Sequence, residues 1–318
     1  MMRIIFSFQT LPVEMLPDLP ADLRIFHSTE TLTVGPLAGW DDPASFWQAR
    51  RSFWRSTPVF DMPDGEKWDA EPWIPINPQA SRFLLELVKK GPPIEDDWPF
   101  AEPEPMEEVV QQADTIEVWS SSSADETLGL WRLLEDVSRL RSDPAALRIR
   151  SFKKQLRTFE DQALWLQLIG GRQDCPVPAR LVSPEEQEKM RSLGRAAAGL
   201  PQNWPGAWRT DPDAAGVFSV LRGRIPDPAT GLTNIRSRLL SAAQSRWMKM
   251  TRVVGDAMVK GWDDADQLNV GILQMELEAM AQLELPLVEI TGQGAMRHCE
   301  VRLTEQGNVL KARLAGAG

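Results

Sequence analysis

The sequence lacks several things, and each shortage excludes a class of protein. It has no tyrosine, so no step can use a phenol as acid, nucleophile or radical site. Its two cysteines, Cys175 and Cys299, are too few for a disulfide framework or a four-ligand zinc site. No apolar run approaches the ~18 residues of a membrane span, and the start from Met1 to Phe8 is too short for a secretory signal. We therefore expect a reduced, cytoplasmic protein without a membrane segment.

Positive charge and phosphate-binding loops are also scarce. Lys plus Arg is 35 against 45 for Asp plus Glu, a net charge of −10, whereas a nucleic-acid backbone demands a basic face. Neither G-x-G-x-x-G nor G-x-x-x-x-G-K-[ST] occurs, which removes the usual nucleotide loops. With two histidines and no clustered carboxylates, we expect no metal site and no cofactor.

What remains is an ordinary globular composition with one aromatic excess. The chain has 318 residues, of which 42% are hydrophobic and 25% charged, enough for about two domains. There are 13 tryptophans, six of them between Trp40 and Trp98.

Short apolar strands alternate with helical patterns in the first half. The segment from Thr127 to Leu140 has apolar residues at helical intervals and is predicted to be an amphipathic helix. Strands are predicted at Arg3–Phe8, Leu23–Phe26, Thr115–Trp119 and Leu147–Phe152. Their order predicts a parallel α/β sheet. A Trp- and Pro-rich insertion, Gly35 to Asp114, carries predicted helices at Pro43–Arg55 and Gln79–Lys90 and a loop at Gly91–Pro105.

The second half is predicted to be mostly helical. Helices are expected at Glu160–Ile169, Ser183–Ala198, Ile235–Val259 and Val270–Leu283, with a Pro- and Gly-rich linker over Asn203–Thr233. Strands at Leu287–Thr291 and Arg297–Leu303 complete a winged-helix-like outline. These patterns give an α/β domain over 1–155, a helical connector and linker over 156–233 and a winged-helix-like domain over 234–318.

Several segments resemble a pair of bacterial domain families. They are Glu30 to Leu37, Thr115–Trp119 with Asp125-Glu126 and Leu130-Trp131-Arg132, Val254-Gly255-Asp256, and Met296 to Leu303. The first two are similar to bacterial proteins with the domain of unknown function 1835, and the last two to their usual partner, the domain of unknown function 3658. The resemblance implies an α/β N-terminal domain and a helical C-terminal one, and it brings no established reaction.

Polar residues follow the predicted strands. These residues are Gln9, Thr10, His27, Ser28, Glu30, Ser120, Ser121, Ser122, Ser123 and Glu126. In a parallel sheet these strand ends share the edge at which open α/β folds bind ligands. A hydroxyl run before a helix can bind an anion, or the serines can simply serve as turn and cap residues, since Ser123 and Glu126 have capping-box spacing.

Histidine offers the candidates for acid–base chemistry. His27 or Glu30 could act as the base in the strand-end crevice. His298 and Cys299 are neighbours on a predicted strand, so their side chains should point to opposite faces and make a poor nucleophile–base pair.

A dense aromatic–basic helix lies in the insertion. It contains Phe46, Trp47, Arg50, Arg51, Phe53 and Trp54, with Phe46–Arg50 and Trp47–Arg51 at cation–π spacing. Such a surface could stack a base or ring, or it could be a helix docked on the protein with snorkelling arginines. Arg51 and Gly35, the latter from Val34-Gly35-Pro36, are further candidate ligand contacts.

Charge is segregated along the chain. Nine acidic residues and no basic one lie between Glu95 and Glu117, and seven basic residues face the single Asp143 between Arg139 and Arg157. These stretches are either two solvated faces or a pair that meets within the chain or across a dimer. In the predicted winged helix, Val270–Leu283 has two glutamates and no Lys or Arg, so specific DNA binding is not expected.

Three functions remain open. The first is a cytoplasmic ligand-binding or assembly protein, with a small anionic ligand at the sheet edge and a C-terminal module for self-association into a homo-oligomer. The second is an enzyme, a hydrolase or transferase using His27 or Glu30. The third is a transcriptional regulator.

Overall fold

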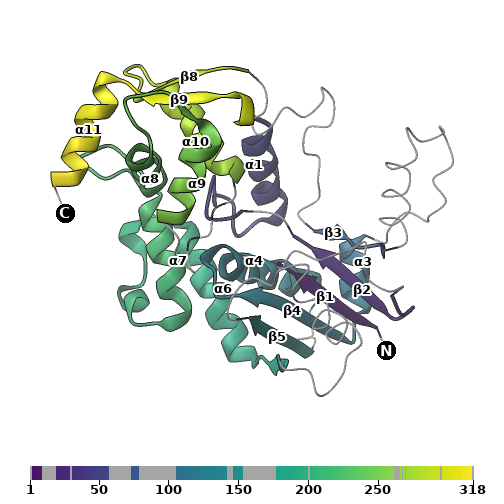
Figure 1. Cartoon of the computed structure of the whole chain (residues 1–318). Coiled ribbons are helices and arrows are strands. Elements are labelled where there is room, and N and C mark those ends of the chain that lie inside the picture. Colours follow the sequence, from purple (N-terminus) through teal and green to yellow (C-terminus); the bar gives the residue numbers. More distant parts are fainter. Residues whose placement is uncertain are drawn as a thin grey trace, which may run out of the picture. The chain divides into compact units, whose positions relative to one another are not determined.

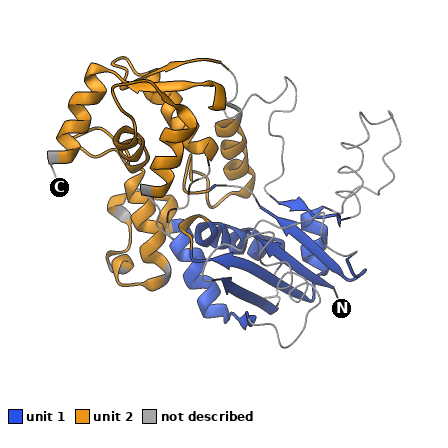
Figure 2. Ribbon diagram, viewed as in Figure 1, with its two compact units in different colours: residues 1–31, 70–122, 126–195 blue, residues 32–69, 123–125, 196–318 orange. Residues whose placement is uncertain are grey.

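The chain forms two compact units, each assembled from separate stretches of sequence. The computed structural model describes residues 2–8, 19–28, 31–56, 73–78, 105–141, 146–152, 177–199, 201–260, 266, 268, 270–293 and 296–316 (Figure 1). Unit 1 comprises residues 1–31, 70–122 and 126–195, and unit 2 comprises residues 32–69, 123–125 and 196–318 (Figure 2). This division differs from the sequence-based boundaries, because residues 32–69 join the C-terminal part of the chain.

Unit 1 is built on a mostly parallel sheet of six strands in the order β3-β2-β1-β4-β5-β6. The strands are β1 (Arg3–Ser7), β2 (Leu23–His27), β3 (Ile74–Pro75), β4 (Thr115–Ser121), β5 (Ala146–Phe152) and β6 (Arg180–Leu181). The four predicted strands are confirmed as β1, β2, β4 and β5, which pair in parallel. Antiparallel β3 and β6 cover the two edges and were not predicted.

Burial of both sheet faces explains the continuous apolar strands. Ile4, Ile5 and Phe6 succeed one another in β1 and all three are buried, as are Ile116 and Val118 of β4. Side chains alternate between faces along a strand, so both faces of the sheet are covered, as is usual for parallel sheets.

Three described helices belong to this part of the chain: α3 (Met106–Gln112), α4 (Ala124–Leu140) and α6 (Pro184–Ala198). The predicted start of α6 is confirmed, because Ser183 Oγ accepts from the backbone N–H of Glu186 at 3.2 Å. Helix α3 falls just beyond the predicted loop. The predicted helices Gln79–Lys90 and Glu160–Ile169 lie outside the described residues.

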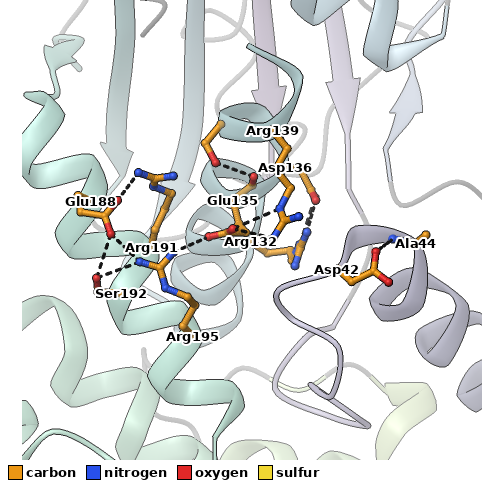
Figure 3. Close-up of polar contacts among 11 residues, drawn as sticks. Asp42, Ala44, Arg132, Glu135, Asp136, Arg139, Glu188, Arg191, Ser192 and Arg195 are labelled. Carbon is orange, nitrogen blue, oxygen red and sulfur yellow. Dashed lines mark hydrogen bonds and ion pairs between the residues drawn. The ribbon is translucent and has the colours of Figure 1, made fainter. Parts of the chain in front are cut away.

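Helix α4 buries charged side chains as well as apolar ones, and Figure 3 shows the polar contacts of the charged ones. Arg132 pairs with Asp136 one turn later, and both are buried. Glu135 accepts from Arg195 of α6 at 3.0 Å and from Arg139 at 3.3 Å. The Arg195–Glu135 pair joins α4 to α6 within unit 1, whereas the other two pairs lie within α4.

The acidic and basic stretches meet inside unit 1. Glu117 of β4 is buried and accepts from Arg150 Nε of β5, from Trp119 Nε1 at 2.6 Å and from Arg3 at 3.3 Å. Arg141 donates to backbone carbonyls at the end of α3. The within-chain alternative is therefore realised at these residues.

Unit 2 contains helix α1 (Pro43–Ser56), helix α7 (Pro212–Gly223) and a winged-helix arrangement. The latter runs α8 (Asn234–Ala242), β7 (Met248–Lys249), α9 (Met250–Lys260), α10 (Val270–Ala281), β8 (Val288–Thr291), β9 (Glu300–Leu303) and α11 (Glu305–Gly316). The three strands form an antiparallel sheet in the order β7-β9-β8. The mixed α/β class with a C-terminal β-hairpin is thus confirmed.

Several predictions for unit 2 were wrong in detail. The predicted helix Ile235–Val259 is two helices, α8 and α9, separated by β7 because Met248 and Lys249 pair with β9. The predicted linker Asn203–Thr233 contains α7, whose Phe218 is fully buried. The predicted strand Arg297–Leu303 is shorter, since a 3₁₀ turn occupies Met296–His298.

The core of unit 2 lies among the winged-helix elements. Leu239 of α8, Val253 of α9, Leu277 of α10 and Val301 of β9 are completely buried in one cluster. Phe53 and Trp54 of α1 pack against that cluster, so α1 docks on the winged helix although it lies far away in sequence. Within the described ranges, no helix is long and apolar enough to cross a membrane.

Candidate ligand site at the carboxyl edge of the sheet

The ends of β1, β2 and β4 lie side by side. β1 runs parallel to β2 on one side and to β4 on the other, and Ser7 is in register with both His27 and Trp119. Backbone bonds continue past the strands: Ser28 N donates to Ser7 O at 3.1 Å and Phe8 N to Trp119 O at 3.0 Å. The predicted convergence of the first, second and third strand ends is confirmed.

This edge is also the point where the strand order reverses. The chain passes from β1 to β2 on one side and then to β4 on the other, which creates the switch point at which open α/β sheets place ligands. Of the predicted site residues, His27, Ser28, Ser120, Ser121 and Ser122 lie at this edge, whereas Ser123 belongs to unit 2. Gln9, Thr10 and Glu30 lie outside the described residues.

The serine run joins β4 to α4 and is mostly buried. Ser120, Ser121 and Ser123 are buried, whereas Ser122 is exposed. Glu126 is buried too, and its Oε2 accepts from Ser121 N at 2.5 Å. In a capping box the glutamate accepts from the backbone N–H of the N-cap residue, which here would be Ser123. The Glu126 carboxylate instead bonds to Ser121, two residues earlier, and so links the end of β4 to the first turn of α4.

His27 is fixed in one orientation. Its Nδ1 lies 3.1 Å from the carbonyl oxygen of Ser7. A carbonyl can only accept, so Nδ1 carries the hydrogen and the neutral ring keeps its lone pair on Nε2. Burial lowers the pKa of His27 below its ordinary value, and the bond to Ser7 opposes this shift in part. The ring is therefore neutral at pH 7.

A pH dependence of stability follows from the lowered pKa of His27. The unfolded chain takes up a proton near pH 6.5 while the folded chain resists it. The contribution of neutral His27 to the free energy of unfolding is fully present above pH 6.5. It should be lost as the pH falls through the pKa that His27 has in the folded chain. Urea unfolding at pH 7.5 and 5.5 measures this loss. The variant His27→Gln should flatten the curve and exposed His298→Gln should not; equal slopes in all three proteins would contradict the expectation.

The aromatic–basic helix is explained by packing within unit 2. Arg50 is buried, donates to Val34 O at 2.5 Å and lies over the rings of Phe53 and Trp54, 5.9 and 5.6 Å from their centroids. The docked-helix alternative therefore fits, with Arg50 over rings later in the helix than the predicted partner Phe46. Arg51 is half-buried on the same helix.

Gly35 serves the same packing. Its φ of +88° favours glycine, and a Cβ there would lie 2.8 Å from the Phe53 ring and 2.9 Å from Arg50. Gly35 and Arg51 belong to unit 2, whereas the sheet edge belongs to unit 1. The structure gives Gly35 a role in seating α1.

The other candidate groups do not form a reactive pair. His298 ends a 3₁₀ turn, is exposed and accepts from Arg297 Nε at 3.0 Å, whereas Cys299 is buried. Neither residue lies on a strand, which corrects the prediction, although one still faces solvent and the other the core. In the described part of the chain, no group of three or more His, Cys, Asp or Glu could hold a metal.

Sequence reasoning missed Trp73. Its ring packs edge-on against Phe6 and Phe8, with centroids 4.9 and 5.1 Å apart, and it directly precedes β3, which pairs with the end of β2. The local excess of tryptophan was visible in the sequence, but nothing separated Trp73 from its neighbours.

Comparisons with known proteins add little to this geometry. The chain matches no protein-family model and no curated protein. Among solved structures it is similar to the Plasmodium falciparum topoisomerase II DNA-binding, cleavage and re-ligation domain, at 10% identity and a TM-score of 0.37. The match covers 95% of this chain and 47% of the topoisomerase chain, so this chain spans about half of that structure. Likeness at this level establishes neither fold nor function.

Proposed function

We propose that this chain is a cytoplasmic ligand-binding protein that holds a small anionic ligand at the carboxyl edge of the unit 1 sheet. The observation that carries the proposal is the parallel pairing of β1 with both β2 and β4, because open α/β sheets bind ligands at such a reversal. Four buried serines stand at the strand ends along this edge: Ser7, Ser28, Ser120 and Ser121.

The first turn of α4 decides which kind of anion suits the edge. The N-terminal turn of a helix carries a positive electrostatic potential, which attracts negative charge. The buried carboxylate of Glu126 lies in the same turn, where it repels a bare oxyanion but can accept from a hydroxyl. A ligand with both an anionic group and hydroxyls, such as a sugar phosphate or a hydroxy acid, therefore fits better than phosphate alone.

The winged-helix part of unit 2 is proposed to serve self-association into a homo-oligomer. Helix α10 carries no Lys or Arg, and its Glu276 pairs with Arg236 of α8 at 2.7 Å. This helix has no cation to offer a DNA backbone, so specific duplex binding is not part of the proposal.

The geometry of His27 favours an enzyme as a second candidate. The neutral ring keeps a lone pair on Nε2 at the carboxyl edge, as a general base requires. In this alternative, a hydrolase or transferase acts on the ligand bound between β1 and β4.

Ribose 5-phosphate and inorganic phosphate are the probes that test the proposal. We expect isothermal titration calorimetry to show ribose 5-phosphate binding about tenfold more tightly or better, since each hydrogen bond to a charged group contributes about 1.5–3 kcal/mol. In Glu126→Gln a side-chain oxygen that can accept from the backbone N–H of Ser121 is kept and the charge is removed. Inorganic phosphate should therefore bind more tightly, and the preference for ribose 5-phosphate over inorganic phosphate should narrow.

Native mass spectrometry of the same samples gives the number of subunits and the mass of any retained ligand. A bound molecule whose mass differs from that of the added probe would show that the probe had been converted and would favour the enzyme. No binding of either probe and no retained small molecule would overturn the ligand proposal. A 35.7 kDa species alone would overturn self-association.

A further inference from the structure

An unsatisfied hydrogen-bond donor lies beside the proposed site. Trp73 is 5% exposed, and its Nε1 is buried with no hydrogen-bond partner among the residues that the structure describes. A buried indole N–H usually finds an acceptor, and leaving one unpaired costs about 1–3 kcal/mol. Such a group in a native protein calls for an explanation.

The position of Trp73 within unit 1 places its indole ring at the carboxyl edge. Its ring touches that of Phe8, the residue that follows β1, and the next residue, Ile74, pairs with His27 at the end of β2. Trp73 thus sits over the ends of two strands whose carboxyl edge forms the proposed site.

Phe8 also lies against α4. A Cβ on Gly129 would overlap the Phe8 ring, so only glycine lets α4 approach the end of β1 so closely. Gly129 lies one turn after Glu126 on the same face of the helix. Phe8 therefore contacts the Trp73 ring and also lies against α4 at Gly129, so the Trp73 ring and this part of α4 both adjoin the residue that follows β1.

We propose that Trp73 is a ligand-binding residue whose indole N–H donates to an oxygen of the small anion held at this edge. The inference rests on the proposed function, and it adds to that site a hydrogen-bond donor from the residue that directly precedes the edge strand β3. A neutral N–H suits this role, because it selects an acceptor atom without adding a charge to an edge where Glu126 already carries one. The chemical class that it recognises is a phosphate or carboxylate oxygen.

Removing the N–H alone gives the sharpest test. Incorporating β-(3-benzothienyl)alanine at position 73 keeps the bicyclic ring and replaces N–H by sulfur, and Trp73→Phe removes the donor with part of the ring. Both should bind ribose 5-phosphate about ten- to a hundredfold more weakly than the wild type, the range for a lost bond to a charged group. Trp204→Phe is the matched control, since Trp204 Nε1 in unit 2 is also buried without a partner; it should bind like the wild type.

Nuclear magnetic resonance reports on the same bond in the unaltered ring. Of the 13 indole N–H signals, the one absent from the benzothienyl protein belongs to Trp73, and it should move downfield when ribose 5-phosphate is added to the wild type. The role of Trp73 alone would be overturned if the wild type bound ribose 5-phosphate, both Trp73 variants bound it equally well, and the Trp73 signal did not move. The indole N–H would then be explained by its packing against the rings of Phe6 and Phe8. Absence of binding by the wild type would overturn the proposed function itself.

Discussion

Replacing Arg150 with methionine should destabilise unit 1 by about 3–5 kcal/mol. Arg150 donates to the Glu117 carboxylate, which is 2% exposed in the middle of β4, and also to Val177 O. Without the guanidinium, the carboxylate stays buried with only Trp119 Nε1 and the more distant Arg3. The free energy of unfolding in urea, followed by far-ultraviolet circular dichroism, measures the loss.

Two control variants test whether the loss of stability comes from leaving a buried charge without its partner or from breaking any ion pair. The double variant Glu117→Met, Arg150→Met removes both charges and should regain most of the lost stability, because apolar pairs often replace buried ion pairs at no net cost. Arg180→Met breaks an exposed pair with Glu186 at 2.7 Å and should change stability by about 0–1 kcal/mol. A loss below about 1 kcal/mol in Arg150→Met would show that Glu117 does not depend on its partner.

The variant Gly307→Ala should destabilise unit 2 by about 3 kcal/mol. Gly307 lies in the first turn of α11, and a Cβ there would overlap the carbonyl oxygen of Leu287 and lie 3.3 Å from the Leu303 side chain. The obstacle is backbone, and Leu287 O also accepts from Thr304 N at 3.2 Å. The helix must therefore move away from the three-stranded sheet. Differential scanning calorimetry of the full chain gives the shift.

Gly255→Ala provides the matched control in the same unit. Gly255 is inside α9, and a Cβ there meets nothing within 4 Å. Alanine should raise stability by about 0.5–1 kcal/mol through its better helix propensity. If Gly307→Ala proved as stable as Gly255→Ala, the close approach of α11 to Leu287 would be wrong.

The sequence predicted the elements whose pattern is local. The stretch Arg3 to Phe8 was predicted as a strand because it is a short apolar run, and Thr115 to Trp119 because it alternates and is β-branched. The start of α6 was predicted from its N-cap, Ser183. The linker prediction failed because Pro and Gly were taken as breakers. Pro212 instead begins α7, with Asp211 Oδ1 accepting from Ala214 N at 3.3 Å, and Gly223 ends it.

Other elements depend on partners distant in sequence. No Pro or Gly lies between Ala243 and Trp247, so nothing local signals the break between α8 and α9; it arises because Leu303 N donates to Gln244 O and β7 pairs with β9. Strands of two residues, such as β3, leave no periodicity to detect.

The candidate site divides in the same way. Its serines and His27 could be found because they follow strong strands, and their convergence follows from parallel pairing. The donor of Trp73 could not be found, because it reaches Phe6 and Phe8 through tertiary packing.

The interleaving of the two units in the sequence constrains how the protein is made. The ribosome releases α1 long before it synthesises the α8–β9 region, against which Phe53 and Trp54 pack. Until then these rings have no native cover, and the closing contact spans about 200 residues. Contacts of such separation slow folding and leave intermediates exposed to aggregation. A chain truncated between residues 155 and 234 therefore leaves α1 without the core against which it packs. We expect the growing chain to depend on chaperones until its C-terminal third has been synthesised.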